Sequence, residues 1–313
     1  MRPAILLIGA NGQVGRELNA ALPSVGEVTA LDRQRLDLTR PEQVRCAIRD
    51  FQPALIVNAA GYTAVDQAES EVALARAVNA VAPAVMAEEA KKIGAVLIHY
   101  STDYVFDGTK TTPYEEDDPA NPLSVYGRTK LEGERAIQAS GVAHLIFRTS
   151  WVYATSGRNF LLTILRLATQ REELRVVRDQ TGAPTLSREI ARATAQILEQ
   201  ISARHPDRIS PEEASGVYHM TAAGETSWYE LAKTILEEAA GVPEARPWLT
   251  AATGGLPLIA RRVVPITAAE YLALARRPAY SVLSNARLAR AFSVQLPDWR
   301  KQLHSVFANS PSK

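Results

Sequence analysis

Near its amino terminus the sequence reads Ala4-Ile5-Leu6-Leu7-Ile8-Gly9-Ala10-Asn11-Gly12-Gln13-Val14-Gly15. The first five residues form a short apolar run, which predicts a strand buried on both faces of a sheet. Three glycines then follow in a G-x-x-G-x-x-G pattern, just before an amphipathic stretch over Val14–Ala21. A strand, a glycine-rich turn and a helix in this order are typical of the first unit of a parallel α/β sheet.

The same alternation continues through the first half of the chain. Short apolar runs recur at Ala4–Ile8, Val28–Leu31, Leu55–Asn58, Val96–Tyr100 and Leu145–Arg148. Amphipathic stretches separate them at Val14–Ala21, Pro41–Phe51, Val72–Ile93 and Val125–Ala139. Gly94 and Gly141 stand where helices should end. The pattern predicts an α/β fold, a Rossmann-like doubly wound parallel sheet.

The pattern becomes less regular after residue 150. Residues 1–150 are predicted to form the sheet domain, and residues 151–313 mainly a smaller C-terminal α/β substrate-binding lobe. Around residues 174–225 we expect the chain to re-enter the first domain. The two domains are therefore not separated at a single point in the sequence.

Composition excludes several classes of protein. The chain has 313 residues, and its 35 Lys+Arg against 34 Asp+Glu give a net charge of +1, which argues against nucleic acid and anionic membranes as partners. A single cysteine, Cys46, suits a reducing compartment. Scattered histidines, and apolar runs too short to span a bilayer, predict a cytoplasmic protein without a metal site.

The glycine turn has the context of a dinucleotide-binding site. Gly residues let the backbone approach a pyrophosphate, and the helix N-terminus offers unpaired N–H groups. Asp32 follows the second strand, 20 residues after Gly12, where an acid commonly binds the adenosine ribose. Asp32 alone favours NADH, but Arg33 and Arg35 can hold a 2′-phosphate or lie solvated in the loop. We expect NADPH, with NADH as the alternative.

A proton-transfer pair is predicted on the helix over Val125–Ala139. Tyr126 and Lys130 are spaced i, i+4, so they share one face of the helix. A lysine ammonium beside a phenol is expected to lower its pKa from about 10. Thr102 follows the strand before it, at the sheet edge where ligands bind, and a hydroxyl there can bond the same substrate oxygen or cap a turn.

These motifs together resemble the extended short-chain dehydrogenases/reductases and, within them, the dTDP-4-dehydrorhamnose reductase family. The narrower resemblance rests on ordered runs that span nearly the whole chain from Ile5 to Trp299. These runs are Asn58–Asp66, Tyr100–Phe106, Arg148–Tyr153 and Asp179–Thr185. The resemblance implies hydride transfer from NADPH to C4 of dTDP-4-dehydro-β-L-rhamnose, giving dTDP-β-L-rhamnose.

The resemblance also implies roles for individual residues. Tyr126 would be the general acid, Lys130 would bind the nicotinamide ribose, and Thr102 would assist at the sugar. Substrate contacts would include Asp103, Trp151 and Arg277, although Trp151 also suits a core position and Arg277 a structural salt bridge. The implied cofactor contacts are Gly9, Gly12, Gln13, Val14, Gly15, Asp32, Arg33, Asp37, Leu38, Ala59, Ala60, Gly61, Tyr62, Thr63, Tyr126 and Lys130. For Asp37, helix capping is the competing interpretation.

Three alternatives and one departure stand beside this interpretation. A dehydratase of this superfamily needs a Glu where this chain has Tyr104. An epimerase retaining NAD, or a non-catalytic regulatory subunit, is the remaining competitor. The resemblance extends to relatives that form dimers through magnesium held by a glutamate cluster. Glu17 matches one position of that cluster, but Arg188 and Arg300 stand where other acids would be. We therefore expect a monomer, or a homodimer without a bridging metal.

Overall fold

A parallel sheet of six strands forms the larger part of the molecule. The computed structural model describes residues 2–201, 209–242 and 246–308. The strand order is β10-β5-β4-β3-β1-β2, and every neighbouring pair is parallel. The strands are β1 (Ala4–Ile8), β2 (Glu27–Leu31), β3 (Leu55–Asn58), β4 (Val96–Thr102), β5 (His144–Thr149) and β10 (Gly216–His219). The predicted fold class is confirmed.

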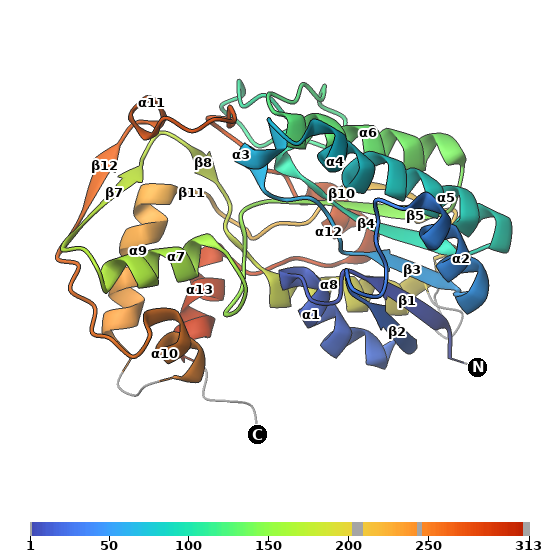
Figure 1. Cartoon of the computed structure of the whole chain (residues 1–313), viewed down its shortest axis with the longest axis horizontal. Helices are drawn as coiled ribbons and strands as arrows, with labels where there is room; N and C mark the ends of the chain where they lie inside the picture. Colours follow the sequence, from blue (N-terminus) through green and yellow to red (C-terminus); the bar gives the residue numbers. More distant parts are fainter. Residues whose placement is uncertain (1, 202–208, 243–245, 309–313) are drawn as a thin grey trace.

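Helices cover both faces of this sheet (Figure 1). In β1, Ile5 and Leu7 join the apolar cluster under α1 (Gln13–Ala21) and α8 (Ser187–Ile201). Leu6 and Ile8 point the opposite way, into the cluster under α2 (Pro41–Phe51), α5 (Ala82–Ile93) and α6 (Val125–Ser140). Successive side chains of a strand face opposite sides, so a sheet covered on both faces needs an unbroken apolar run.

Helix ends follow local chemistry. Both α5 and α6 end at glycines, Gly94 and Gly141, in the left-handed conformation, as expected. The predicted single helix over 72–93 is instead α4 (Val72–Arg76), a π-type turn over Ala77–Val81 and α5. The short α3 (Val65–Ala68) precedes them, and the 3₁₀ turns η1 (Leu22–Ser24) and η3 (Asp103–Val105) follow α1 and β4.

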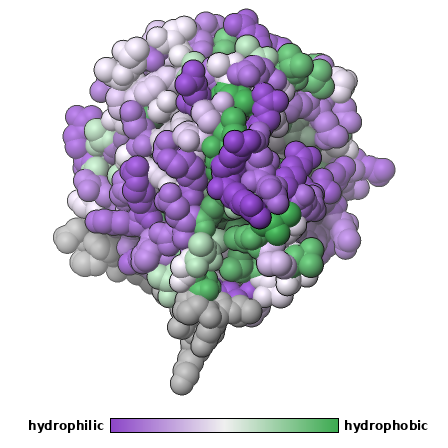
Figure 2. Space-filling view, turned by 90° about the vertical axis from the view of Figure 1, so that its left-hand side faces the viewer, coloured by the Kyte–Doolittle hydropathy of each residue, from purple (hydrophilic) through white to green (hydrophobic). Residues whose placement is uncertain are grey.

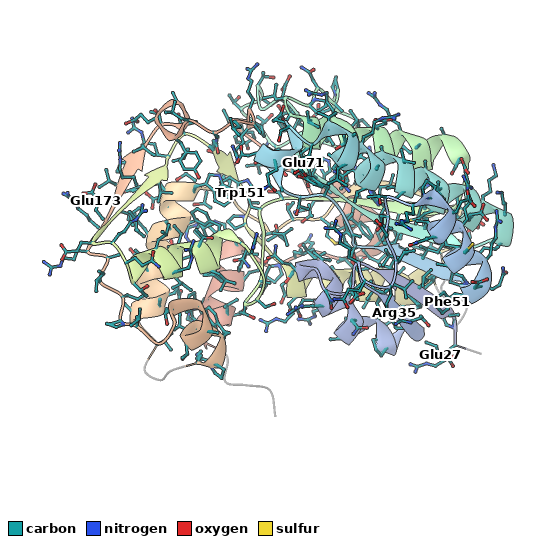
Figure 3. All side chains as sticks on the ribbon, in the orientation of Figure 1. Glu27, Arg35, Phe51, Glu71, Trp151 and Glu173 are labelled. Carbon is teal, nitrogen blue, oxygen red and sulfur yellow. The ribbon has the colours of Figure 1, made fainter. Side chains whose placement is uncertain are left out.

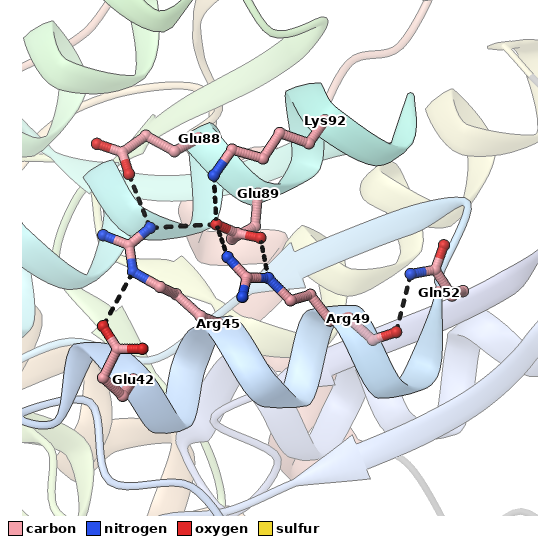
Figure 4. A network of polar contacts seen from close by, with 7 residues as sticks. All are labelled: Glu42, Arg45, Arg49, Gln52, Glu88, Glu89 and Lys92. Carbon is pink, nitrogen blue, oxygen red and sulfur yellow. Dashed lines mark hydrogen bonds and ion pairs between the residues drawn. The ribbon is translucent and has the colours of Figure 1, made fainter.

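A network of ion pairs connects α2 to α5, which cover the same face of the sheet (Figure 4). Glu89 of α5 is only 1% exposed and accepts hydrogen bonds from Arg45, Arg49 and Lys92. These cations hold the pKa of Glu89 at about 2, with Arg49 contributing most, against the opposing effect of burial. A buried carboxylate needs such partners, so the network fixes how the two helices pack.

The smaller lobe, on the left in Figure 1, has its own apolar cluster. Its helices are α7 (Phe160–Ala168), α9 (Trp228–Ala240), α10 (Pro247–Thr253), α11 (Ala268–Tyr271) and α13 (Trp299–Ala308). Its short strands pair as β7 (Glu173–Val177) with β12 (Arg262–Ile266), β8 (Thr181–Gly182) with β11 (Thr226–Ser227), and β6 (Val152–Tyr153) with β9 (Thr185–Leu186). Figure 2 shows its outer end, mostly hydrophilic with a narrow hydrophobic band.

The chain passes between the two parts more than once. After β9, α8 packs on α1, and β10 adds to the large sheet beside β5. Near the end of the chain, α12 (Ala286–Phe292) joins the cluster under α1 before α13 returns to the lobe. We propose the division into domains given above on these packing clusters. No helix in the described part of the chain is long and apolar enough to cross a membrane.

Candidate active site

A cavity of about 630 Å³ opens at the carboxyl ends of the strands, between the sheet and the smaller lobe. Its floor includes the ends of β1 and β3, where the chain order of the sheet reverses. Ligands of open α/β sheets bind at such a reversal point. Trp151, which follows β5, lies between the two parts of the molecule (Figure 3).

The structure brings most of the predicted site residues to this one cavity. The lining includes Gly9, Gly12, Gln13, Val14, Asp32, Arg33, Asp37, Leu38, Ala59, Ala60, Gly61, Tyr62, Thr63, Thr102, Asp103, Tyr126, Lys130 and Trp151. Gly15 and Arg277 lie outside the lining. The individual roles stay predictions, but their residues share one space.

The glycine turn is shaped for a close approach to its ligand. Gly9 has φ +88°, and a Cβ there would lie 2.6 Å from the amide nitrogen of Ala60. A Cβ on Gly15 would lie 2.0 Å from the carbonyl oxygen of Gly9, so Gly15 lets α1 pack on the turn. Gly12 caps α1, and Gln13 and Val14 open it facing the cavity. An uncovered helix N-terminus of this kind fits the diphosphate of a dinucleotide.

Asp32 and Arg33, the residues predicted to bind the adenosine, both line the cavity. Asp32 accepts hydrogen bonds from Asn11 Nδ2 (2.7 Å) and from the amides of Gln34 and Arg35. The Arg33 side chain lines the cavity, whereas Arg35 donates to the carbonyl oxygen of Ala30. Of the two arginines, Arg33 is therefore placed to meet a 2′-phosphate.

Asp37 serves a local turn as well as lining the cavity. Its Oδ1 accepts from the amide and the hydroxyl of Thr39, at 3.0 and 2.7 Å. These bonds to Thr39 are the main reason that the pKa of Asp37 is lowered. The residue that caps α2 is Arg40, so the turn comes just before the helix.

The predicted proton donor, Tyr126, lines the same cavity, and its hydroxyl is buried. Burial raises the pKa of Tyr126 to about 12, and the nearby Thr102 hydroxyl lowers it only in part. The lowered pKa expected for Tyr126 beside Lys130 is not seen in this structure, in which the Lys130 amino group contacts other residues. Lys130 Nζ lies 2.6 Å from the carbonyl oxygen of Tyr100 and 3.0 Å from His99 Nε2. Burial lowers the pKa of Lys130 itself to about 8, despite Glu134.

Thr102 caps a turn, the second of the two roles considered for it, and its bond to a substrate oxygen stays a prediction. Its Oγ1 accepts from the amide of Tyr104, which caps η3, and donates to Asp103 Oδ1 at 3.0 Å. Burial raises the pKa of Asp103 to about 6. The ring of Tyr104 stands edge-on to that of Tyr126, with centroids 5.6 Å apart. This packing helps to hold the Tyr126 ring beside Thr102.

Two tryptophans close the lobe side of the cavity. Trp151 has φ +47°, an uncommon conformation for a bulky residue, and its indole lies against Gly182, where a Cβ would come within 2.4 Å of the ring. The indole of Trp228, in α9, stacks on the indole of Trp151, with ring centroids 3.4 Å apart. Sequence analysis did not find Trp228, nor Arg158, which also lines the cavity. Both come from the lobe, and no local pattern marks them.

Two further predicted residues form contacts of their own. Arg277 pairs with Asp66 at 2.7 Å, in the manner of the structural salt bridge considered above. Burial raises the pKa of Glu17, and Arg188 opposes that effect. Among residues 2–201, 209–242 and 246–308, no three metal-ligating side chains gather at one point. The absence of a metal remains a prediction.

The sheet, its glycine turn and the buried tyrosine define an NAD(P)-dependent oxidoreductase with the fold of extended short-chain dehydrogenases/reductases. Residues 1–311 match the family model described as the RmlD substrate binding domain, and the chain belongs to that family. The predicted resemblance is confirmed.

Named relatives cover nearly the whole chain. A dTDP-4-dehydrorhamnose reductase from Burkholderia thailandensis is 49% identical over 95% of both chains, and one from Escherichia coli K12 is 43% identical over 98% of this chain and 99% of its own. The crystal structure of a Bacillus anthracis dTDP-4-dehydrorhamnose reductase in complex with NADP has a TM-score of 0.86 at 32% identity, covering 99% of this chain and all of its own. A Thermus thermophilus UDP-glucose 4-epimerase, 18% identical with a TM-score of 0.72, shows the shared fold alone.

Proposed function

We propose that the protein reduces the C4 keto group of dTDP-4-dehydro-β-L-rhamnose with NADPH, giving dTDP-β-L-rhamnose, the last step of dTDP-rhamnose biosynthesis. One observation carries the chemistry: Tyr126, Thr102 and Lys130 line the same cavity as the glycine turn. The named relatives support the substrate. Arg33 beside Asp32 supports NADPH, with NADH as the alternative.

The residues of this chain supply the proton and the orientation. When bound, the reduced nicotinamide supplies a hydride to the carbonyl carbon. Tyr126 keeps its proton at neutral pH because burial raises its pKa, so the acid form is fully present. Its hydroxyl donates that proton to the C4 oxygen, and solvent later returns one to the phenolate. The Thr102 hydroxyl, beside Tyr126, is placed to bond the same oxygen.

The surrounding residues hold the sugar and limit the entry of water. Asp103 lies next to Thr102 and lines the cavity, where it can accept from a sugar hydroxyl. The stacked indoles of Trp151 and Trp228 offer an apolar wall for the sugar ring. Arg277 lies outside the cavity lining and is paired with Asp66. Once released from Asp66, its guanidinium group would contact the nucleotide end of the substrate.

Two competing activities can be separated from this one. Tyr104, rather than a carboxylate, stands beside Asp103, so the cavity lacks at that place the base that a dehydratase needs. An epimerase would recycle its cofactor without net oxidation. The intact Tyr126, Thr102 and Lys130 disfavour a purely regulatory subunit. Residence in the cytoplasm, and a monomer or metal-free dimer, remain predictions.

The test is nicotinamide absorbance with NADPH, with and without freshly prepared dTDP-4-dehydro-L-rhamnose. We expect one NADPH oxidised per keto-sugar consumed, with dTDP-rhamnose as the product. Protein that binds NADPH but oxidises none would contradict the proposal, and conversion of sugar without oxidation would favour an epimerase. Repeating the assay with NADH gives the cofactor preference.

A further inference from the structure

A buried histidine links the sheet to the amino group of Lys130. His99, in β4, is fully buried. Its Nδ1 lies 3.0 Å from Asn58 Nδ2, and its Nε2 lies 3.0 Å from Lys130 Nζ. None of the roles derived above uses His99.

The hydrogen bonds of Asn58 assign the tautomer of His99. Asn58 Oδ1 accepts from the amide of Ala60 at 3.1 Å, so its NH₂ group must face His99. His99 Nδ1 is then an acceptor. Burial lowers the pKa of His99 well below its usual value, so the ring is neutral. A neutral imidazole that accepts at Nδ1 carries its proton on Nε2.

This proton points at Lys130. An ammonium group has three donors and no acceptor, so it cannot form a hydrogen bond with Nε2–H. A neutral amine can accept from Nε2–H with its lone pair while donating to the carbonyl oxygen of Tyr100, 2.6 Å away. The observed contact therefore fits the neutral amine.

We propose that His99, oriented by Asn58, is a positioning residue that binds the neutral amine of Lys130, so that Lys130 leaves His99 when it takes up a proton. His99 thereby sets the pH at which the charge of Lys130 becomes available in the cavity. Burial of Lys130 acts in the same direction.

The acidic groups on α6 and on the elements packed against it have partners of their own. On α6, Glu134 favours the ammonium, but it is paired with Arg148 of β5 at 2.7 Å. Asp103 of η3 bonds Thr102. From α4, Arg76 pairs with Glu132, and from α5, Glu89 turns to the arginines of α2. Burial raises the pKa of Tyr126 to about 12, so it carries no charge at neutral pH. The remaining side chain that acts on the protonation of the Lys130 amino group is His99.

The consequence for turnover rests on the proposed reaction. A charged Lys130 favours the phenolate that remains after Tyr126 gives up its proton. We therefore expect activity to fall as the pH rises through the pKa of Lys130, near 8. In His99→Gln, the side-chain amide can turn its oxygen toward the ammonium, and this basic limb should move up by about one pH unit.

The test does not depend on turnover. In protein with ¹⁵N-labelled histidine, NMR reads the tautomer of His99, and ¹³Cε-labelled lysine reads the titration of Lys130, assigned with Lys130→Met. We expect the proton on Nε2, and a Lys130 pKa about one unit higher in His99→Gln than in the wild type.

A matched control is His219→Gln, a buried histidine of β10 that packs against Phe106 rather than Lys130. It should leave the Lys130 titration in place. A proton on Nδ1 in the wild type would overturn the proposal even if His99→Gln failed to fold. So would a Lys130 pKa that is equal in the wild type and His99→Gln, or that moves as far in His219→Gln. The assay of NADPH oxidation tests the reaction separately.

Discussion

The indole of Trp151 lies flat on the indole of Trp228, with ring centroids 3.4 Å apart and planes 5° apart. Trp151 follows β5 of the large sheet, whereas Trp228 begins α9 of the smaller lobe. The stack therefore joins the two parts of the molecule at the wall of the cavity. It also explains how Trp151 is held in an uncommon backbone conformation, since Gly182 supports its other side.

Removing the indole of Trp228 should weaken substrate binding more than it slows turnover. In Trp228→Ala, Trp151 loses its stacking partner, and we expect KM for the sugar nucleotide to rise about tenfold with a smaller change in kcat. Steady-state kinetics at saturating NADPH measures both. Trp248→Ala is the matched control, because Trp248 packs on Phe307 within the lobe. An equal rise in KM in the control would contradict a specific role for the stack.

Cofactor preference should depend on one of two neighbouring arginines. Of these two arginines only Arg33 lines the cavity, so in Arg33→Ala NADPH binding should weaken about tenfold while NADH binding changes little. Arg35→Ala should leave both affinities nearly unchanged, since Arg35 binds Ala30. Fluorescence titration with each dinucleotide checks this, and a larger loss of NADPH affinity in Arg35→Ala would refute it.

The network at Glu89 should make stability depend on pH (Figure 4). We expect Glu89→Gln to lower the free energy of unfolding by about 2 kcal/mol at pH 7, less than for a fully enclosed pair because Arg49 and Lys92 are half exposed. The pKa of Glu89 is about 2 in the folded protein, below the ordinary 4.5. Its contribution is therefore complete above pH 4.5 and lost as the pH falls toward 2.

Urea denaturation of both proteins at several pH values measures this difference. The gap between wild type and Glu89→Gln should narrow as the pH is lowered from 5 toward 3. Glu88→Gln is the control, because Glu88 is half exposed and binds Arg45 alone among the three cations. A gap that stays constant with pH would show that Glu89 acts through packing rather than charge.

Local patterns predicted the large sheet well. Strands buried on both faces leave unbroken apolar runs, and β3 and α2 have the predicted bounds. Glycines mark the turn and the ends of α5 and α6 because only glycine fits those conformations easily. The smaller lobe was harder to predict. Its strands β6, β8, β9 and β11 have two residues each, too few for any period to show.

The chemistry of the site was predictable only in part. The i, i+4 spacing placed Tyr126 and Lys130 on one helix face, and both line the cavity. Their pKa values depend on burial and on partners from other strands, which spacing does not reveal. The contacts of Lys130 with Tyr100 and His99 arise because β4 runs under α6. Trp228 reaches the cavity through the packing of the lobe, more than 75 residues after Trp151 in sequence.

The most direct test of the account is Tyr126→Phe, which removes the phenolic hydroxyl with little change in shape. We expect kcat to fall by about 10²–10⁴-fold while the Kd for NADPH stays within about twofold of the wild type. Tyr218→Phe, which removes a buried hydroxyl bonded to Ala214, should keep wild-type turnover. Turnover by Tyr126→Phe at the wild-type rate would contradict the assignment of Tyr126 as the proton donor.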